Sequence, residues 1–473
     1  MVFSSTVFLF LFLPVVLTGY FLLPRSWRNA YLLVASLLFY AWGEGFYLLI
    51  MLMSIAMNYV GGRLIHALPS RPRKKLALSF VIAMNLLLLG SFKYANFVVD
   101  NLNLPLAALG LGQWSLDPVH LPIGISFFTF QAMSYLVDIY RGDAKAQRNP
   151  VNTALYIAMF PQLIAGPIVR YQHIHEQINQ RKESFELIAG GIALFIVGLG
   201  KKVLIANPMG EIADNIFAIP VDHLTFELSW IGAIAYTLQI YFDFSGYSDM
   251  AIGLGRIFGF RFLINFDYPY IARSMREFWR RWHISLSSWF RDYLYVPLGG
   301  NRNGPWRTCF NLLVVFLLCG LWHGASWNFV IWGLMHGAFL ALERSPFGGW
   351  MSHRHRVVQH VYVLVVVVFA WVIFRADNLD YALAYWGAMS GFGPNASYLF
   401  YPLMYLNVYS LTIAGAGIVG STPFWPVLRE KFRNARPAPA LDVAATAFLL
   451  AIVALSAMHL AVGTHNPFIY FRF

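Results

Sequence analysis

Apolar runs of about 20 residues recur along the whole chain, and they restrict its fold more than any other feature. A helix of that length crosses the hydrocarbon core of a bilayer, whereas the strands of a membrane barrel would be short and alternating. Only 12% of the residues are charged and 58% are hydrophobic, although a soluble domain carries about 25% charged residues. We therefore predict an all-α integral membrane protein with roughly a dozen spanning or embedded segments.

The net charge of +12 does not make this a nucleic-acid-binding protein. The basic residues lie in short loops between apolar runs, where Lys and Arg mark the cytoplasmic side and contact anionic membrane lipid. If successive apolar runs cross the membrane in opposite directions, the basic loops at 25–28, 71–75 and 141–148 fall on the same side of it. The basic stretches at 354–356 and 429–436 fit that side as well. This parity predicts that both termini lie outside the cytoplasm.

We predict one membrane-embedded domain that has three parts. These are N-terminal spans over 1–150, a core over 151–345 and C-terminal spans over 346–473. Polarity rises in the core, where the apolar stretch 153–167 ends in Gly166-Pro167. That break indicates a re-entrant segment, which enters the membrane without crossing it and is tolerated only against protein or a wet cavity.

Residues 243–249 place two carboxylates and several hydroxyls in an otherwise apolar region. Such groups are costly at membrane depth unless they line a cavity or pair with cations. The alternative is a break in the helix with local capping by Ser245 and Asp249. We favour a cavity lining, and its candidate residues are Asp243, Ser245, Tyr247 and Asp249.

The segment 274–298 differs from the spans because Arg and His alternate with Trp and Phe at helical spacing. This pattern is typical of an amphipathic helix that lies in the membrane interface. A simple anchor would need neither the Arg291-Asp292 pair within it nor the adjoining turn 299–302, which is rich in Gly, Asn and Arg. We therefore assign this segment to the core and not to a surface anchor alone.

Two histidines, His323 and His336, lie in consecutive apolar runs. Ionisable groups at membrane depth are costly and commonly functional, and histidine moves protons near neutral pH. The alternative is a histidine that is hydrogen-bonded between packed helices. The histidine pairs at 173–175 and 353–355 could bind a metal, but closely spaced loop histidines are more often ordinary polar residues. We predict no metal site.

Long motifs that occur in order along the chain carry a family resemblance. On them the sequence resembles the membrane-bound O-acyltransferase (MBOAT) family. Within it, the chain is most similar to the bacterial branch of alginate- and cellulose-acetylation membrane proteins, and the D-alanyl transfer protein of teichoic acid synthesis is more distant. The motifs are Met1–Ser5, Phe92–Phe97, Leu121–Phe127, Leu163–Pro167, Tyr241–Asp249, Glu277–His283, Arg291–Leu294, Gly299–Arg302 and Leu321–Gly324.

The resemblance implies a helical bundle around a central tunnel. In this tunnel a thioester donor enters from the cytoplasm, and a funnel opens to the tunnel from the outside. It implies that His323 is catalytic and that Asp292 is a polar partner near the site. It implies no bound cofactor. Residues that we expect to support the site or line the tunnel are Trp322, His336, His283, Arg280, Arg291 and Asn301, together with the four named above on 243–249.

Acyl transfer needs a nucleophilic hydroxyl, a base and a stabilised oxyanion. Since no serine stands next to His323, we predict direct transfer with His323 as the general base. The expected donor is acetyl-CoA or an acetylated carrier that approaches the basic cytoplasmic face around 276–302. The acceptor is either the polysaccharide or a serine on a periplasmic acetyltransferase partner protein, and we favour the partner.

The predicted function is therefore the O-acetylation of an alginate- or cellulose-type exopolysaccharide across the bacterial inner membrane. Two other classes remain. A polysaccharide export channel predicts large polar pore surfaces and an internal repeat, and the sequence has no repeat. A membrane scaffold for a synthesis complex explains the amphipathic segment but not a histidine at depth. The sequence does not specify the polymer, the acyl group or the oligomeric state.

Overall fold

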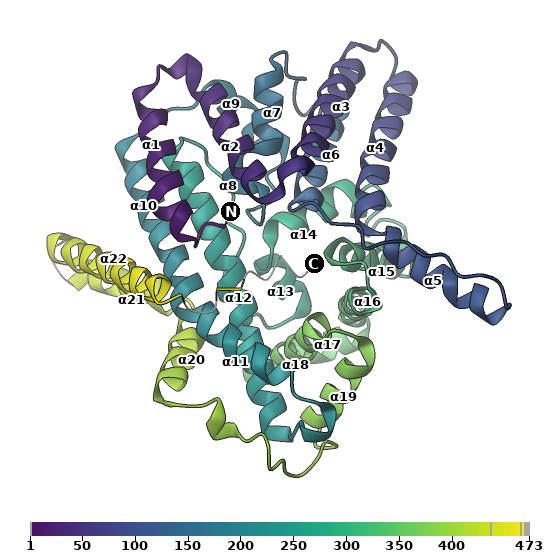
Figure 1. Cartoon of the computed structure of the whole chain (residues 1–473), viewed down its shortest axis with the longest axis vertical. Helices are drawn as coiled ribbons and strands as arrows, with labels where there is room; N and C mark the ends of the chain where they lie inside the picture. The colour runs from purple at the N-terminus through teal and green to yellow at the C-terminus, as the bar shows by residue number, and fades with distance from the viewer. Residues whose placement is uncertain (1, 436–437, 464–465, 468–473) are drawn as a thin grey trace. The chain divides into compact units, whose positions relative to one another are not determined.

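A computed structural model of the chain describes residues 2–435, 438–463 and 466–467 (Figure 1). Met1 of the first motif and Arg436 of the last basic stretch lie outside these residues. The described residues form helices and no strand, which confirms the all-α prediction. They form two compact units, one of residues 1–192 and 251–263 and one of 193–250 and 264–473.

The first unit is built from the N-terminal helices. Short π- or 3₁₀-helical turns, labelled η, connect several of them. The elements are η1 (Phe8–Phe12), α1 (Leu13–Leu22), η2 (Arg25–Trp27), α2 (Arg28–Glu44), η3 (Gly45–Tyr47), α3 (Leu48–Ala67), α4 (Arg71–Lys93), α5 (Ala95–Ala108), α6 (Ile125–Arg141), α7 (Pro150–Ala158), α8 (Phe160–Leu163) and α9 (Tyr171–Asn179).

Helices α3, α4 and α6 pack together in this unit, and α3 and α4 run side by side (Figure 1). Between α3 and α4, the amides of Asn58 and Asn85 exchange hydrogen bonds of 3.0 and 2.9 Å, and both residues are fully buried. Such reciprocal amide pairs hold apolar helices together where lipid supplies no hydrophobic driving force. On α3, Gly62 leaves room for the ring of Tyr135 on α6.

The second unit holds the later helices. α10 (Phe185–Gly200) and α12 (Phe226–Ile257) contribute residues to both units. The other elements are η4 (Lys201–Ala206), α11 (Asn207–Phe217), η5 (Val221–His223), η6 (Pro269–Ile271), α13 (Met275–Arg281), α14 (Ile284–Phe290), η7 (Arg291–Tyr295), α15 (Gly304–His323), α16 (Trp327–Leu342), α17 (Pro346–Ser352), α18 (Arg356–Arg375), α19 (Leu379–Met389), η8 (Pro402–Met404), α20 (Val408–Gly420), α21 (Phe424–Ala435) and α22 (Ala438–Ala461).

Several helical stretches among the described residues are long and apolar enough to cross a membrane. Six qualify by length and composition, and three shorter apolar helices occur at Phe8–Leu22, Trp327–Leu342 and Val408–Gly420. The chain is thus a multi-pass membrane protein. The six stretches are Arg25–Ala67, Arg71–Lys93, Phe185–Phe217, Gly304–His323, Arg356–Arg375 and Asp442–Ala461.

The stretch 153–167 is irregular and buried. α7 ends at Ala158, α8 adds only four residues, and the backbone of Gly166 lies against Gln162. Every residue from 155 to 171 is buried. Irregular backbone of this kind is tolerated at membrane depth only where protein covers it. The burial of this stretch meets that requirement, on which the prediction of a re-entrant segment depends.

One alternative and one local prediction are wrong. The helix break at 243–249, which was the alternative to the favoured cavity lining, does not occur, because α12 continues through these residues. The continuous amphipathic helix over 274–298 is replaced by α13, α14 and η7, because Trp282 is extended and His283 adopts a left-handed conformation with φ of 43°. The aromatic face of this segment also packs against protein, since the ring centroid of Trp279 lies 4.9 Å from that of Phe316 on α15.

Candidate active site

The hairpin of α15 and α16 carries two of the candidate histidines, and glycines bring its helices into close contact. Gly320 of α15 lies against the carbonyl group of Phe329, and Gly333 of α16 lies against the carbonyl group of Phe316. A Cβ atom at either glycine would overlap that carbonyl, so only glycine permits this approach. α15 ends at His323, and the tight packing of the hairpin therefore sets the position of this histidine.

His323 is enclosed by aromatic rings and is 7% exposed. The ring centroids of Trp322, Trp332 and Phe374 lie 5.0, 5.0 and 5.2 Å from the centroid of its imidazole, and all three rings are close to perpendicular to it. Such packing fixes the orientation of the imidazole and excludes water from most of its surface. The structure thus places this side chain inside the protein and not on a lipid-facing surface.

His336 is fully buried, and its tautomer is determined by one contact. The indole N–H of Trp279 donates a hydrogen bond of 3.3 Å to Nδ1 of His336. Because an indole can only donate, Nδ1 is an acceptor and the neutral ring carries its proton on Nε2. The ring of Trp332 lies 4.7 Å from His336 as well as 5.0 Å from His323, so one indole contacts both histidines.

A third buried histidine, His283, belongs to a polar cluster around Asn265. Oδ1 of Asn265 accepts from the backbone N–H of Ser285 at 3.1 Å, and its Nδ2 donates to Ser248 at 2.9 Å. These two bonds fix the orientation of the amide, since a backbone N–H can only donate. Nδ1 of His283 lies 3.2 Å from the same Oδ1 and must therefore carry the proton.

This arrangement leaves Nε2 of His283 as an acceptor inside an apolar enclosure. No described residue donates a hydrogen bond to it. The rings of Phe244 and Trp322 lie 4.6 and 6.1 Å from the imidazole. Burial lowers the pKa of His283 to about 3, so the ring stays neutral at physiological pH. His283 therefore offers a lone pair next to the tryptophan that precedes His323.

A cavity of about 610 Å³ adjoins the hairpin. The segment that connects α15 to α16 lines it, as does Phe374, whose ring contacts His323. A volume of this size suits a small substrate or the tip of a larger one. The lining residues are Asp214, Phe217, Ala218, Tyr236, Gly324, Ala325, Ser326, Phe329, Phe374, Arg375, Ala376 and Asp377.

The cavity wall has one cation and two carboxylates. Nη2 of Arg375 lies 2.7 Å from Oδ1 of Asp214, and its Nη1 lies 4.0 Å from the largely exposed Asp377. The guanidinium also lies over the ring of Phe217 at 5.0 Å. With these three groups ionised, the lining carries a net charge of −1. This wall is therefore unfavourable for polyanions.

Four of the predicted site residues lie on α12, all in one stretch: Asp243, Ser245, Tyr247 and Asp249. The two carboxylates pair with consecutive lysines of η4. Nζ of Lys202 lies 2.8 Å from Asp243, and Nζ of Lys201 lies 2.6 Å from Asp249. Gly246 of α12 lies against the backbone of Lys202 in η4 and of Gly198 near the end of α10, which allows the two segments to approach closely. Pairing with cations, one of the two arrangements expected for such carboxylates, is thus present.

Asp292 and Arg291 bind each other at the start of η7. The guanidinium donates to both carboxylate oxygens, at 2.7 and 3.1 Å, and this bond raises the pKa of Arg291. Arg280 on α13 and Asn301 in the turn before α15 are exposed. Ring contacts thus join His323, Trp322, His336 and His283 into one aromatic region. The predicted residues Asp243, Asp249, Arg291 and Asp292 instead form ion pairs.

Sequence reasoning missed several residues of this region. Trp332 and Phe374 contact His323, and Arg375 with Asp214 forms the polar wall of the cavity. One signal was available, because Arg375 ends an apolar run and is followed by Asp377. The ring contacts themselves have no signature in the sequence.

Comparison with known proteins identifies the chain. The model of the membrane-bound O-acyltransferase family matches residues 124–384, which include the hairpin, the cavity wall and α12. The chain belongs to the membrane-bound O-acyltransferase family. It is therefore a multi-pass membrane O-acyltransferase, as its motifs predict.

Relatives of this acyltransferase act on cell-surface polymers, according to their names. It is 44% identical, over the whole of both chains, to a probable alginate O-acetylase of Pseudomonas putida. It is 38% identical to a peptidoglycan O-acetyltransferase of Helicobacter pylori over 83% of this chain and 80% of the relative. A teichoic acid D-alanyltransferase of Bacillus subtilis is 31% identical over 46% of this chain and 58% of its own.

Proposed function

We propose that this acyltransferase moves an acetyl group from a cytoplasmic thioester to a hydroxyl on the periplasmic side of the bacterial inner membrane, for O-acetylation of an exopolysaccharide. The observation that carries the proposal is the position of His323, which is buried among aromatic rings at the end of α15, while the residues directly after it line a cavity. The names of the alginate and peptidoglycan relatives support acetyl as the acyl group and a polysaccharide as the final acceptor.

In the proposed reaction His323 accepts the proton of the acceptor hydroxyl. The hydroxyl oxygen attacks the thioester carbonyl, a C–O bond forms, and the C–S bond breaks. The departing thiolate takes the proton from the imidazolium, so protons balance and the histidine returns to its neutral form. General base catalysis of this kind contributes about 10²- to 10⁴-fold to the rate. The perpendicular rings around His323 hold the base in one orientation throughout.

The negative charge that develops on the thioester oxygen needs a positive partner. Ser326, which directly precedes α16, and Phe329 in the first turn of α16 both line the cavity. The first backbone N–H groups of a helix have no partner within it, and the helix dipole is positive at that end. We propose that this end of α16 stabilises the oxyanion.

The donor is proposed to be acetyl-CoA or an acetylated carrier. α13 and the residues before it expose three arginines, Arg273, Arg276 and Arg280, while Arg281 is paired with Glu277 and Asp267. Exposed guanidinium groups bind the phosphates of such donors well. Asp292 stays a proposed second site residue, and its bidentate pair with Arg291 holds the carboxylate in one orientation.

The acceptor is proposed to be a hydroxyl of a periplasmic acetyltransferase partner, which passes the acetyl group to the polymer. The charge of the cavity supports this relay. Asp214 and Asp377 outnumber Arg375 on the wall, so a polyuronate such as alginate would be repelled, while a neutral serine side chain would not. The relay also requires only a small acceptor group to reach His323.

The proposed orientation rests on the basic loops. Residues 71–75 and 141–148 would lie in the cytoplasm, because Lys and Arg in short loops stay on that side. This orientation puts the N-terminus and the end of α22 in the periplasm. The arginines of α13 are proposed to face the cytoplasm as well, because the proposed donor is cytoplasmic.

The test is replacement of His323 by alanine and by glutamine in cells that make the polymer, with measurement of bound acetyl groups and secreted polymer. We expect acetylation to fall at least 100-fold at unchanged protein level, with normal polymer secretion. Wild-type acetylation in either variant would refute the proposal. Loss of secretion together with acetylation would favour an export channel. Loss of acetylation together with loss of partner co-purification would favour a scaffold, whereas lost acetylation with unaffected co-purification supports a catalyst.

A further inference from the structure

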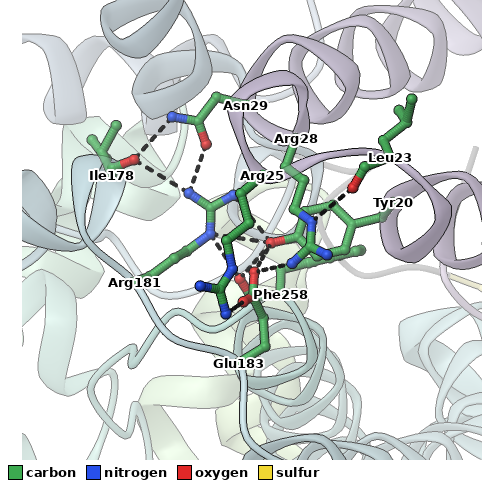
Figure 2. A network of polar contacts seen from close by, with 9 residues as sticks. All are labelled: Tyr20, Leu23, Arg25, Arg28, Asn29, Ile178, Arg181, Glu183 and Phe258. Carbon is green, nitrogen blue, oxygen red and sulfur yellow. Dashed lines mark hydrogen bonds and ion pairs between the residues drawn. The ribbon is translucent and has the colours of Figure 1, made fainter.

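An unbalanced group of arginines lies in the first unit, at the turn between α1 and α2 (Figure 2). This arginine cluster consists of Arg25, Arg28 and Arg181, which surround the single carboxylate of Glu183. Nη1 of Arg28 lies 2.8 Å from Oε1 of Glu183, and Nη2 of Arg25 lies 4.0 Å from Oε2. The hydroxyl of Tyr20 donates to the same carboxylate at 2.7 Å.

Arg181 directs its hydrogen bonds to neutral acceptors. It donates to the side chain of Asn29 at 2.6 Å, to the carbonyl of Phe258 at 2.9 Å and to the hydroxyl of Tyr20 at 3.1 Å (Figure 2). These bonds satisfy the guanidinium geometrically but leave its charge unbalanced. Three cations and one anion give the arginine cluster a net charge of +2. Lys182, which is exposed, adds a further positive charge beside it.

Two members of the cluster keep donors that no described residue uses. The side chain of Arg25 is 75% exposed, and its distance of 4.0 Å to Glu183 is too long for a hydrogen bond. Arg28 donates through Nε to the carbonyl of Leu23 and through Nη1 to Glu183, and its Nη2 is unused within the described residues. A guanidinium presents paired donors that match phosphate oxygens, so these groups suit a phosphate.

The side chains around the arginine cluster indicate which kind of phosphate compound would bind there. Arg28 lies over the ring of Tyr20 at 4.9 Å, and three large apolar residues of the same turn are exposed, namely Phe21 at 40%, Leu22 at 80% and Trp27 at 65%. Exposed tryptophan beside an apolar helix end is typical of the membrane–water interface. A soluble nucleotide or phosphate ion would leave these apolar side chains uncovered, whereas the acyl chains of a lipid would cover them.

We propose that the arginine cluster binds the headgroup phosphate of an anionic phospholipid, with the acyl chains of that lipid against Phe21, Leu22 and Trp27. The lipid phosphate balances the excess charge and joins the α1–α2 turn to the segment before α10. Phosphatidylglycerol fits the site because it carries a net negative charge, while phosphatidylcholine is neutral overall. The site is independent of the acyl-transfer reaction proposed above.

The test uses the full chain in micelles of a neutral detergent and measures thermal unfolding as phosphatidylglycerol, phosphatidylcholine or inorganic phosphate is added. A ligand that binds the folded state raises the unfolding temperature. We expect phosphatidylglycerol to raise it in the wild type and phosphatidylcholine and inorganic phosphate to have no such effect. An equal rise with inorganic phosphate would assign the site to a soluble anion, and an equal rise with phosphatidylcholine would exclude headgroup recognition.

Arg25→Gln is the test variant, because the exposed side chain makes no hydrogen bond to a described residue and we expect its replacement to leave the fold intact. Arg73→Gln is the matched control, since Arg73 is an exposed arginine in the first turn of α4 with no described partner. We expect Arg25→Gln to need about fivefold more phosphatidylglycerol than the wild type to reach half of the maximal rise in unfolding temperature. Lys182→Gln should also raise the concentration that is needed. Equal responses of Arg25→Gln and Arg73→Gln would overturn the proposal.

Discussion

Lys202 and Asp243 form an ion pair in which Nζ and Oδ1 lie 2.8 Å apart and both side chains are at most 2% exposed. Lys202 also donates to the carbonyl of Pro467. A buried charge is tolerated only while it is paired, so the two residues depend on each other. The pair connects η4 to α12, the helix that also carries Ser245 and Tyr247 of the predicted site.

Replacement of one member of this pair is expected to destabilise the protein strongly. Asp243→Leu leaves the lysine buried without its counter-charge, which costs about 3–5 kcal/mol. The double variant Lys202→Met with Asp243→Leu removes both charges and should recover most of that loss. The measurement is thermal unfolding in micelles with a matched Asp249→Leu variant, whose partner Lys201 is more exposed and whose loss should be smaller. Equal stability of Asp243→Leu and the double variant would contradict the coupling.

Alanine at Gly320 or Gly333 is expected to separate α15 from α16 and displace His323. The added Cβ atom overlaps a backbone carbonyl at either position, and overpacking of this kind costs about 1–3 kcal/mol. Acetylation in cells should fall at least tenfold even where protein remains in the membrane. Gly349→Ala is the control, because it is helical with no neighbour within 4 Å of the added atom. It should keep full activity, and equal behaviour of all three variants would rule out a role for close packing.

The sequence allowed the fold class and the burial of His323 to be predicted, because both depend on the length of apolar runs and the cost of polar groups inside them. It also indicated that the carboxylates of 243–249 need partners. The identity of those partners, Lys201 and Lys202, could not be derived, because they lie on another element and looked like an ordinary basic helix end. Pairing between distant helices has no local signature.

The amphipathic segment shows a second limit. Helical spacing of aromatic and basic residues over 274–298 predicted one helix in the interface. The break at His283 depends on Asn265, which lies upstream and bonds both the histidine and Ser285. A left-handed residue that is held by a distant amide cannot be recognised from propensity, since only a small fraction of histidines adopt this conformation. The contact of the Trp332 ring with both His323 and His336 could not be predicted from the sequence either.

Ser326 allows a direct test of the mechanism, since it lines the cavity three residues after His323. If transfer is direct, Ser326→Ala should keep acetylation within about twofold, while His323→Ala should lose about 10²- to 10⁴-fold. Mass spectrometry of the wild-type chain after incubation with an acetyl thioester should find no acetylated serine at this position. Loss of activity in Ser326→Ala together with an acetyl group on Ser326 would replace direct transfer by a covalent intermediate.

Glu183 makes stability depend on acid pH in a defined direction. Burial alone would raise the pKa of its carboxyl, but hydrogen bonds from Tyr20 and Arg28 outweigh burial and lower it below the ordinary value of about 4.3. A lowered pKa in the folded state stabilises the protein fully above the ordinary value, and this contribution is lost as the pH falls through the folded-state pKa. The difference in unfolding temperature between wild type and Glu183→Gln should therefore be largest near pH 7 and shrink below about pH 4.3. Glu186→Gln, which changes an exposed residue on the next turn, should show no such trend, and a constant difference for Glu183→Gln down to about pH 3 would exclude the ionised carboxylate as the cause.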